Sequence, residues 1–178
     1  RVCVVASKSI RNNHEDYIKS VFSRTLVQIV VAPDGEPLLQ SALPLARQLS
    51  EFKPDLIVAI GGGSVIDLAK LLWVVYEQPY LDLIISDSNR VRVRDLRSKA
   101  NFVACPSTFG SGSENSSAAV FQIQKKSPKQ FLLGTELLPD ICVLDPTFCK
   151  GLPFEVAGAG ILDAIAHAVE GVVSPFSN

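Results

Sequence analysis

Two glycine-rich turns and one pairing of an acid with a histidine are the parts of this sequence whose residue types and spacing could do chemistry. The first turn follows the apolar run at residues 56–60 and reads GGGSVIDLAK, beginning with Gly61, Gly62, Gly63 and Ser64. Backbone N–H groups at a helix start lack partners within the helix and carry the positive end of its dipole. This junction of strand and helix therefore favours phosphate. A turn without a ligand is the alternative, because glycines also end strands for steric reasons.

The second turn follows the apolar run at residues 102–105 and reads PSTFGSGSEN. Its hydroxyl groups can donate to phosphate or ribose oxygens, while Gly110 and Gly112 allow a close backbone approach. Loops at the carboxyl ends of parallel strands meet in the crevice where α/β folds bind ligands. We therefore expect the two turns to form one site. The alternative for this loop is a helix capping box between Ser111 and Glu114.

The third feature is Asp163 and His167, which lie in the alanine-, glycine- and valine-rich segment 154–173. A spacing of four residues puts the carboxylate and the imidazole on one helical face, within reach of a single divalent cation. One oxygen and one nitrogen ligand suit Fe²⁺ or Zn²⁺. A hydrogen-bonded pair without metal is the alternative. His14, the other histidine, is interpreted as a surface residue.

Composition excludes several classes of function. A formal net charge of -1 provides no broad basic field for nucleic acid. Uninterrupted apolar runs stay below the roughly 18 residues of a membrane span, and no signal-peptide pattern is visible. We therefore expect a cytoplasmic protein that binds neither nucleic acid nor membrane.

The cysteines lack the spacing of a metal or disulfide framework. No CxxC pair occurs among Cys3, Cys105, Cys142 and Cys149. This argues against a disulfide scaffold and against a closed zinc site. We interpret all four as reduced thiols of the core.

Strand-like apolar runs alternate with helical patterns, which indicates an α/β fold with a parallel sheet covered by helices. The expected strands are residues 2–6, 26–32, 56–60, 81–85, 102–105 and 141–144. The expected helices are residues 13–23, 38–51, 64–76 and 154–173. We expect a dinucleotide-binding domain over residues 1–150 and the start of a helical domain over residues 151–178. The chain begins inside a strand and ends after an unfinished helical region, so we expect a longer polypeptide.

Two connecting segments have clear composition. The PDGEP sequence at residues 33–37 is typical of a turn and ends the second strand. Residues 87–99 are poorly periodic and carry five basic side chains, namely Arg90, Arg92, Arg94, Arg97 and Lys99. We interpret this stretch as a solvated loop or hairpin, with a phosphate-binding patch as the alternative.

Together these segments resemble the iron-containing (metal-dependent, group III) alcohol dehydrogenase family, which belongs with the dehydroquinate synthase-like proteins. The family motifs GGGSxxDxAK, PxTxGTGSE and DAxxHxxE correspond to residues 61–70, 106–114 and 163–170, in the family's order. Lys129 stands ten residues before Pro139, which also matches the family's layout. The resemblance implies a Rossmann-like parallel sheet with flanking helices, followed by an all-helical domain.

The resemblance also implies roles for single residues. It implies that Gly62, Gly63 and Ser64, next to Gly61, cradle the pyrophosphate of NAD or NADP. Thr108 and Ser111 would contact the phosphates or the nicotinamide ribose, and Lys129 would approach that ribose. Asp163 and His167 would be the first two metal ligands, the others lying beyond residue 178.

This sequence departs from the family pattern at three places. The acidic residue that often follows the second strand is absent, and Asp34 lies a few residues later, which leaves NAD against NADP open. Ser111 replaces the commoner threonine. The glycine usually found two residues before the metal aspartate is Ile161, with the glycine shifted to Gly160.

The activity that the resemblance implies is hydride transfer between a nicotinamide and a small alcohol or aldehyde, with iron or zinc as a Lewis acid. Because further ligands come from the later helical domain in this family, residues 1–178 alone should turn over little. The family commonly forms dimers. The alternatives are a cyclase or lyase of the dehydroquinate synthase type and a non-catalytic nucleotide-binding module.

Overall fold

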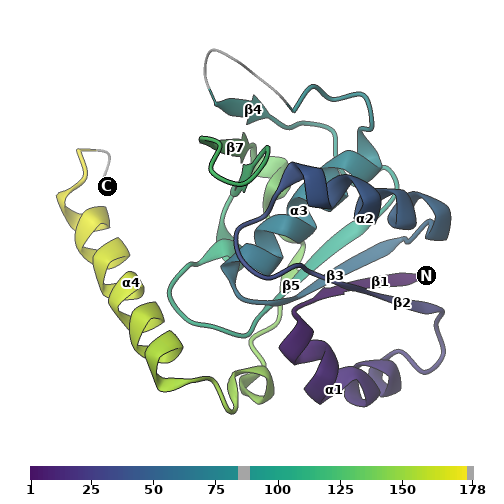
Figure 1. The fold of residues 1–178 in the computed structure, drawn as a ribbon, viewed down its shortest axis with the longest axis horizontal. Helices are drawn as coiled ribbons and strands as arrows, with labels where there is room; N and C mark the ends of the chain where they lie inside the picture. The colour runs from purple at the N-terminus through teal and green to yellow at the C-terminus, as the bar shows by residue number, and fades with distance from the viewer. Residues whose placement is uncertain (84–88, 176–178) are drawn as a thin grey trace.

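The computed structural model describes residues 1–83 and 89–175. Within these residues, five parallel strands form the central sheet in the order β2-β1-β3-β5-β8 (Figure 1). The strands are β1 (Val2–Ala6), β2 (Val27–Val31), β3 (Leu56–Gly61), β5 (Asn101–Pro106) and β8 (Ile141–Cys142). The expected parallel sheet is confirmed, and its carboxyl ends all face one edge.

Helices cover both faces of this sheet (Figure 1). Helix α1 (Lys8–Val21) packs on one face, and α2 (Leu39–Phe52) and α3 (Gly63–Glu77) pack on the other. Because side chains alternate along a strand, Val4 faces α1 and Val5 faces α3. Both faces are apolar, as a parallel sheet buried on two sides requires.

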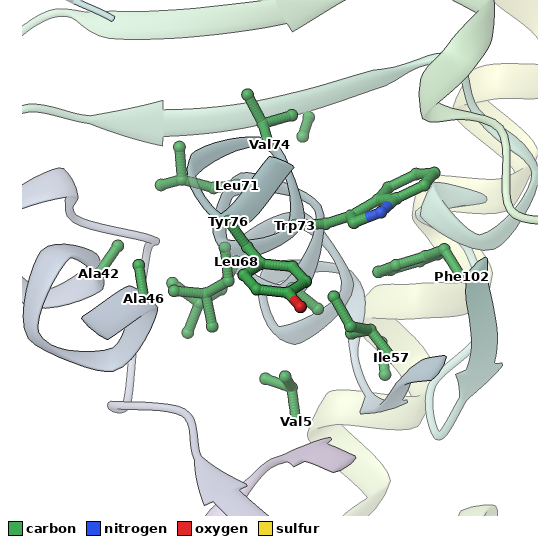
Figure 2. Close-up of a cluster of buried hydrophobic side chains, with 14 of the residues drawn as sticks. Val5, Ala42, Ala46, Ile57, Leu68, Leu71, Trp73, Val74, Tyr76 and Phe102 are labelled. Atoms are coloured by element: carbon green, nitrogen blue, oxygen red, sulfur yellow. The ribbon is translucent and has the colours of Figure 1, made fainter. Parts of the chain in front are cut away.

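Helix α3 lies at the centre of the larger core. Figure 2 shows its side chains pointing toward the sheet, toward α2 and toward the strands beyond. Trp73 stacks on Phe102 with ring centroids 5.0 Å apart, and its indole N–H donates to the carbonyl of Ala100 at 3.0 Å. Burial on nearly every side fixes the helix that carries the first glycine turn at its start.

A second sheet, absent from the sequence prediction, covers the outer side of α3. It has the order β4-β7-β6, formed by β4 (Arg90–Arg92), β6 (Ala118–Gln122) and β7 (Lys129–Leu133). Ala119, Phe121, Gln130 and Leu132 are buried in alternation along β6 and β7. This period of two was present in the sequence as a strand signal.

Short helical turns connect the remaining elements. They are η1 (Ser113–Asn115), η2 (Thr135–Leu137) and η3 (Pro146–Cys149). The chain then enters α4 (Phe154–Val173), whose bounds match the expected helix.

Two expected elements need correction. Residues 81–83 form no regular element, so the strand expected over 81–85 is wrong there, and its last two residues lie outside the described residues. Helix α1 begins at Lys8, five residues before the expected start, because the Ser7 hydroxyl caps it by accepting from the N–H of Ile10 at 3.1 Å.

Of the five basic residues in this segment, four are exposed and Arg97 is half-buried. The Arg97 guanidinium lies over the Trp73 ring and pairs with Asp140 at 2.6 Å and with Glu136 at 3.1 Å. The Lys99 ammonium donates to the carbonyl of Tyr76 at the end of α3. The interpretation as a solvated loop is therefore wrong for Arg97, whereas Lys99 is exposed as expected. Residues 87 and 88 of the segment lie outside the described residues.

The cysteines and His14 also differ in part from expectation. Cys3 and Cys105 are buried, and burial raises the pKa of Cys3 to about 12 and that of Cys105 to about 11, so both are protonated thiols. Cys142 is exposed and Cys149 is half-buried, because they lie on the outermost strand and the following turn. His14 is half-buried, with its ring edge on Phe148.

Helix α4 stands at the side of the molecule (Figure 1). It contains no buried residue, and Phe154 and Leu162 are among its exposed apolar side chains. Of the helices in the described residues, α4 alone is long and apolar enough to span a membrane, by length and composition only. The estimate from uninterrupted apolar runs missed it because Asp163 and His167 interrupt the run.

We expect Trp73→Ala to lower the free energy of unfolding by about 3–5 kcal/mol, because it removes a fully buried indole and leaves a cavity. Tyr80→Ala is the control: Tyr80 is 99% exposed, and its loss should change stability by no more than about 0.5 kcal/mol. Chemical denaturation followed by circular dichroism measures both. Equal stabilities of the two variants would contradict this description of the core.

Candidate functional site

The register of the central sheet brings the two glycine-rich turns to the same level. Strands β3 and β5 are adjacent and parallel, and Gly61 pairs with Pro106 at their last position. The N–H of Ser107 then donates to the carbonyl of Gly61 at 2.9 Å. Both turns therefore leave the same edge of the sheet side by side, where α/β folds bind ligands.

The first turn presents an uncapped helix start. Gly62 is the N-cap residue of α3 in an extended conformation, and no side chain caps the helix. The carbonyl of Gly62 accepts from the N–H groups of Val65 and Ile66. Helix starts without a cap leave backbone N–H groups open to an anion. Ser64, which is exposed, adds a hydroxyl at this end.

The second turn packs directly on the first. A Cβ atom added to Gly62 would lie 3.2 Å from the Thr108 hydroxyl, and one added to Gly63 would lie 2.7 Å from the Ser111 hydroxyl. The hydroxyl of Ser113 would be 3.1 Å from that same Cβ. A side chain would overlap Ser111 at Gly63 and would be tight against Thr108 at Gly62, so hydroxyl groups from one turn line the backbone of the other. The arrangement gathers backbone N–H groups and hydroxyl donors, the chemistry that phosphate and ribose require.

The capping-box interpretation of the second turn is wrong. Turn η1 begins after Gly112, whose φ of 64° is left-handed, and no side chain caps it. The Ser111 hydroxyl accepts from the N–H of Ser113 at 3.4 Å, so its hydrogen bond is made within the loop. The Ser111 hydroxyl thereby stays at the contact with Gly63.

The opposite side of the second turn contacts α4. A Cβ atom on Gly110, whose φ is +113°, would lie 2.1 Å from the carbonyl oxygen of Gly160. A Cβ atom on Gly160 would lie 2.2 Å from the carbonyl oxygen of Phe109. The glycine displaced to position 160 in this sequence is therefore the one that lets α4 approach the loop.

Asp163 and His167 lie on the face of α4 next to that contact. His167 Nε2 and Asp163 Oδ1 are 3.8 Å apart, and both side chains are about half exposed. His167 Nδ1 lies 3.1 Å from the carbonyl oxygen of Gly110. A carbonyl oxygen only accepts, so Nδ1 carries a proton that it donates to Gly110, and Nε2 is the ring nitrogen that faces the carboxylate. This is the usual way in which a metal-binding histidine is oriented.

The pair fits part of a cation site. An imidazole nitrogen and a carboxylate oxygen at this separation can contact one Fe²⁺ or Zn²⁺ ion. Within residues 1–83 and 89–175, no group of three or more histidine, cysteine, aspartate or glutamate side chains gathers to hold a metal. Asp163 and His167 therefore offer two ligands, fewer than the three or four protein ligands of a typical zinc site.

Lys129 pairs with a residue outside both glycine-rich turns. Its ammonium pairs with Glu36 at 2.9 Å, and both side chains are about half exposed. Glu36 and Asp34 belong to the turn at residues 33–37, which lines a small cleft together with Ser64 of α3. Lys129 is therefore linked to the cleft beside Ser64 by its ion pair with Glu36.

Two charged residues beneath the site, the half-buried Asp67 and the buried Lys70, received no role from the sequence. Both belong to the GGGSVIDLAK segment, and Lys70 is fully buried. The sequence did hold a signal for Lys70: it is a lysine between Ala69 and Leu71 on a mostly apolar helix, and a buried lysine needs partners.

Known proteins match the chain as follows. The family described as "Iron-containing alcohol dehydrogenase" matches residues 1–146. An alcohol dehydrogenase of Thermococcus barophilus is 34% identical over 100% of this chain and 49% of its own length. An NADPH-dependent butanol dehydrogenase of Clostridium saccharobutylicum is 32% identical over 85% of this chain and 40% of its own.

Solved structures agree. An iron-containing alcohol dehydrogenase of Thermococcus thioreducens superposes with a TM-score of 0.84 and 36% identity, covering 99% of this chain and 49% of that one. The chain thus spans about half the length of these relatives or less.

We expect Gly110→Ala to release His167, because the new methyl group would displace the carbonyl of Gly160 and with it α4. Imidazole nitrogen NMR of the metal-free protein, with His14→Gln to assign the other ring, should show the proton of His167 on Nδ1. The variant should lose this preference. Gly112→Ala is the matched control, since its φ is also positive and its Cβ meets nothing within 4 Å. A His167 ring without a proton on Nδ1 in the parent would contradict the geometry.

Proposed function

We propose that this chain, which belongs to the iron-containing alcohol dehydrogenase family, is the cofactor-binding part of an NAD(P)-linked, metal-dependent alcohol dehydrogenase or aldehyde reductase. The observation that carries the proposal is the position of the second turn. One side of it lines the phosphate-type turn at Gly62 and Gly63, and the other side holds His167 of α4. A dinucleotide site and a metal-ligand pair are thereby joined by one loop.

The first turn would bind the pyrophosphate. Backbone N–H groups of Gly63 and Ser64 at the start of α3, together with the helix dipole, would neutralise its charge without a basic side chain. Thr108 and Ser111 would donate hydroxyl hydrogen bonds from the facing loop. The absence of a side chain at Gly62 and Gly63 keeps the two loops close enough for both to contact one ligand.

Asp163 and His167 would hold the divalent metal, with the Gly110 carbonyl fixing the His167 ring so that Nε2 is free to bind. When bound, the nicotinamide supplies hydride exchange and the metal supplies Lewis acidity toward the substrate oxygen. The chain's own contribution is to set where these groups meet, since one short loop contacts both places.

The named relatives support the substrate class. The names of the two curated relatives give alcohols as substrates, and one of these enzymes is NADPH-dependent. We propose a small alcohol or aldehyde as substrate and NAD or NADP as cofactor. Asp34 and Glu36, which line a small cleft together with Ser64, would discriminate between the two at the adenosine end.

Helix α4 would open the second, helical domain over residues 151–178, after the dinucleotide-binding domain at 1–150. Its exposed apolar side chains would then pack against the rest of that domain and not against lipid. We further propose a cytoplasmic, dimeric enzyme. These three statements rest on the resemblance to the family.

The test is an assay of the full-length protein loaded with Fe²⁺ or Zn²⁺ against a panel of small alcohols and aldehydes with NAD(H) and NADP(H). We expect reversible, metal-dependent change in nicotinamide absorbance. Product formation without net cofactor change would favour the cyclase alternative. Cofactor binding without any turnover at full metal loading would favour the non-catalytic module.

We expect His167→Ala in the full-length protein to lower metal affinity at least about tenfold and turnover with it, because it removes a ligand. The affinity for NAD(P) should change little, since His167 contacts the far side of the loop. Elemental analysis and cofactor titration measure the two effects. His14→Ala serves as the control, and equal metal content in all three proteins would contradict the role of His167.

We expect Gly63→Ala to weaken NAD(P) binding about tenfold or more, because its methyl group would lie 2.7 Å from the Ser111 hydroxyl and separate the turns. Gly158→Ala is the matched control: the same change in α4 meets nothing within 4 Å. Calorimetric titration with NAD⁺ and NADP⁺ distinguishes them. Indistinguishable affinities in the two variants would rule out this cradle.

A further inference from the structure

The segment that follows the second turn is held by a buried ammonium group. Lys70 has no exposed surface, and its Nζ donates to the carbonyls of Ser113 at 2.8 Å, Ser116 at 2.6 Å and Ala118 at 3.0 Å. An ammonium group has three N–H donors, so these carbonyls use all of them. The hydroxyl of Ser116 lies 3.3 Å from Nζ and itself donates to Ala118.

Asp67 holds the same segment one helical turn earlier. Its Oδ2 accepts from the backbone N–H of Val120 at 3.0 Å. Burial raises the pKa of this carboxylate, and the hydrogen bond from Val120, the charge of Lys70 and the Ser113 hydroxyl lower it. The same hydroxyl lies 3.1 Å from a Cβ atom added to Gly63, which places Ser113 between Asp67 and the first glycine turn.

Stability alone is a poor reason for this arrangement. Burying a charge is costly, and well-packed apolar side chains of similar volume often give equal or greater stability. What an apolar side chain cannot do is bind three carbonyls of an irregular segment in fixed positions. That segment carries one wall of the proposed cofactor site.

We propose that Lys70 and Asp67 are positioning residues that set the second turn against the first, and that Lys70 does so as the ammonium ion. The inference rests on the proposed function, because it assumes that NAD(P) binds between the turns. Neither side chain contacts the cofactor in this account. Both act through Ser113 and the backbone of residues 113–120.

The ammonium requirement predicts a dependence on pH. Burial lowers the pKa of Lys70 from 10.5 to about 8, against the opposing charges of Asp67 and Glu114. Those are the charged groups that face it, from α3 and η1, within the part of the chain that the structure describes. Above that pH the neutral amine has two N–H donors for three carbonyls, so the segment loses one attachment.

Folding and cofactor binding should therefore respond to pH in opposite directions. The unfolded chain keeps the Lys70 proton up to its ordinary pKa, so between about pH 8 and 10.5 the unfolded state binds more protons than the folded state. The contribution of Lys70 to the free energy of unfolding thus rises with pH in this window. Cofactor affinity falls in the same window, which a purely structural role would not produce.

The experiment measures the dissociation constant of NAD⁺ for the full-length protein by calorimetry, from about pH 7 to about pH 9.5. In the parent we expect affinity to fall above pH 8, by up to about tenfold per pH unit for one proton. Lys70→Met should bind NAD⁺ about tenfold or more weakly at pH 7 and show no such step. Lys70→Arg, which stays charged throughout, should bind more tightly than Lys70→Met and also lack the step.

Lys99→Met is the matched control. Lys99 donates to the carbonyls of Tyr76 and Glu77 at the opposite end of the same helix. Its removal should cost stability while leaving the affinity for NAD⁺ and its pH step in place.

The outcomes are distinguishable. Equal NAD⁺ affinity in Lys70→Met and the parent overturns the inference alone. If Lys70→Met does not fold, the pH dependence of the parent is the test. A parent affinity for NAD⁺ that stays constant across the pH range overturns the inference. A parent that binds neither NAD⁺ nor NADP⁺ at any pH overturns the proposed function and the inference together.

Discussion

The whole site depends on the absence of Cβ atoms where three segments meet. Gly63 at the start of α3 touches the Ser111 hydroxyl, and Gly110 in the same loop touches Gly160 of α4. A methyl group at either contact would overlap its neighbour by more than a small adjustment can relieve. Segments some fifty residues apart in the chain are thus brought to one place by the smallest side chain.

From this packing follows a physical link between two chemistries. The loop at residues 108–113 lines the proposed phosphate site with hydroxyl groups, and its Gly110 carbonyl sets the protonated nitrogen of His167. A ligand that orders the loop on one side would also restrict the imidazole on the other, so cofactor and metal binding should influence each other. The rigid sheet and the buried α3 give this loop a fixed base. Lys70 adds a tether from within that base.

Sequence reasoning predicted the central sheet, the helix bounds of α3 and α4 and the meeting of the two turns, because apolar periodicity and glycine position are local signals. It missed the second sheet, because strands β6 and β7 are short and each shows only a few alternating buried residues. Local residue chemistry misled at Ser111 and Glu114, where the backbone of Gly112 shapes the turn instead. The partners of Arg97 and Lys70 lie some forty residues away, beyond what spacing along the chain can reveal. The site roles stay predictions.

The most direct test of the account is a crystal structure of the full-length protein with NAD(P)⁺ and Zn²⁺ or Fe²⁺. The account predicts the pyrophosphate against the backbone of Gly62 and Gly63, with Thr108 and Ser111 on its other side. It predicts the metal on Asp163 and on Nε2 of His167, whose Nδ1 stays on the Gly110 carbonyl. A dinucleotide bound elsewhere, or both places empty at saturating concentrations, would contradict it.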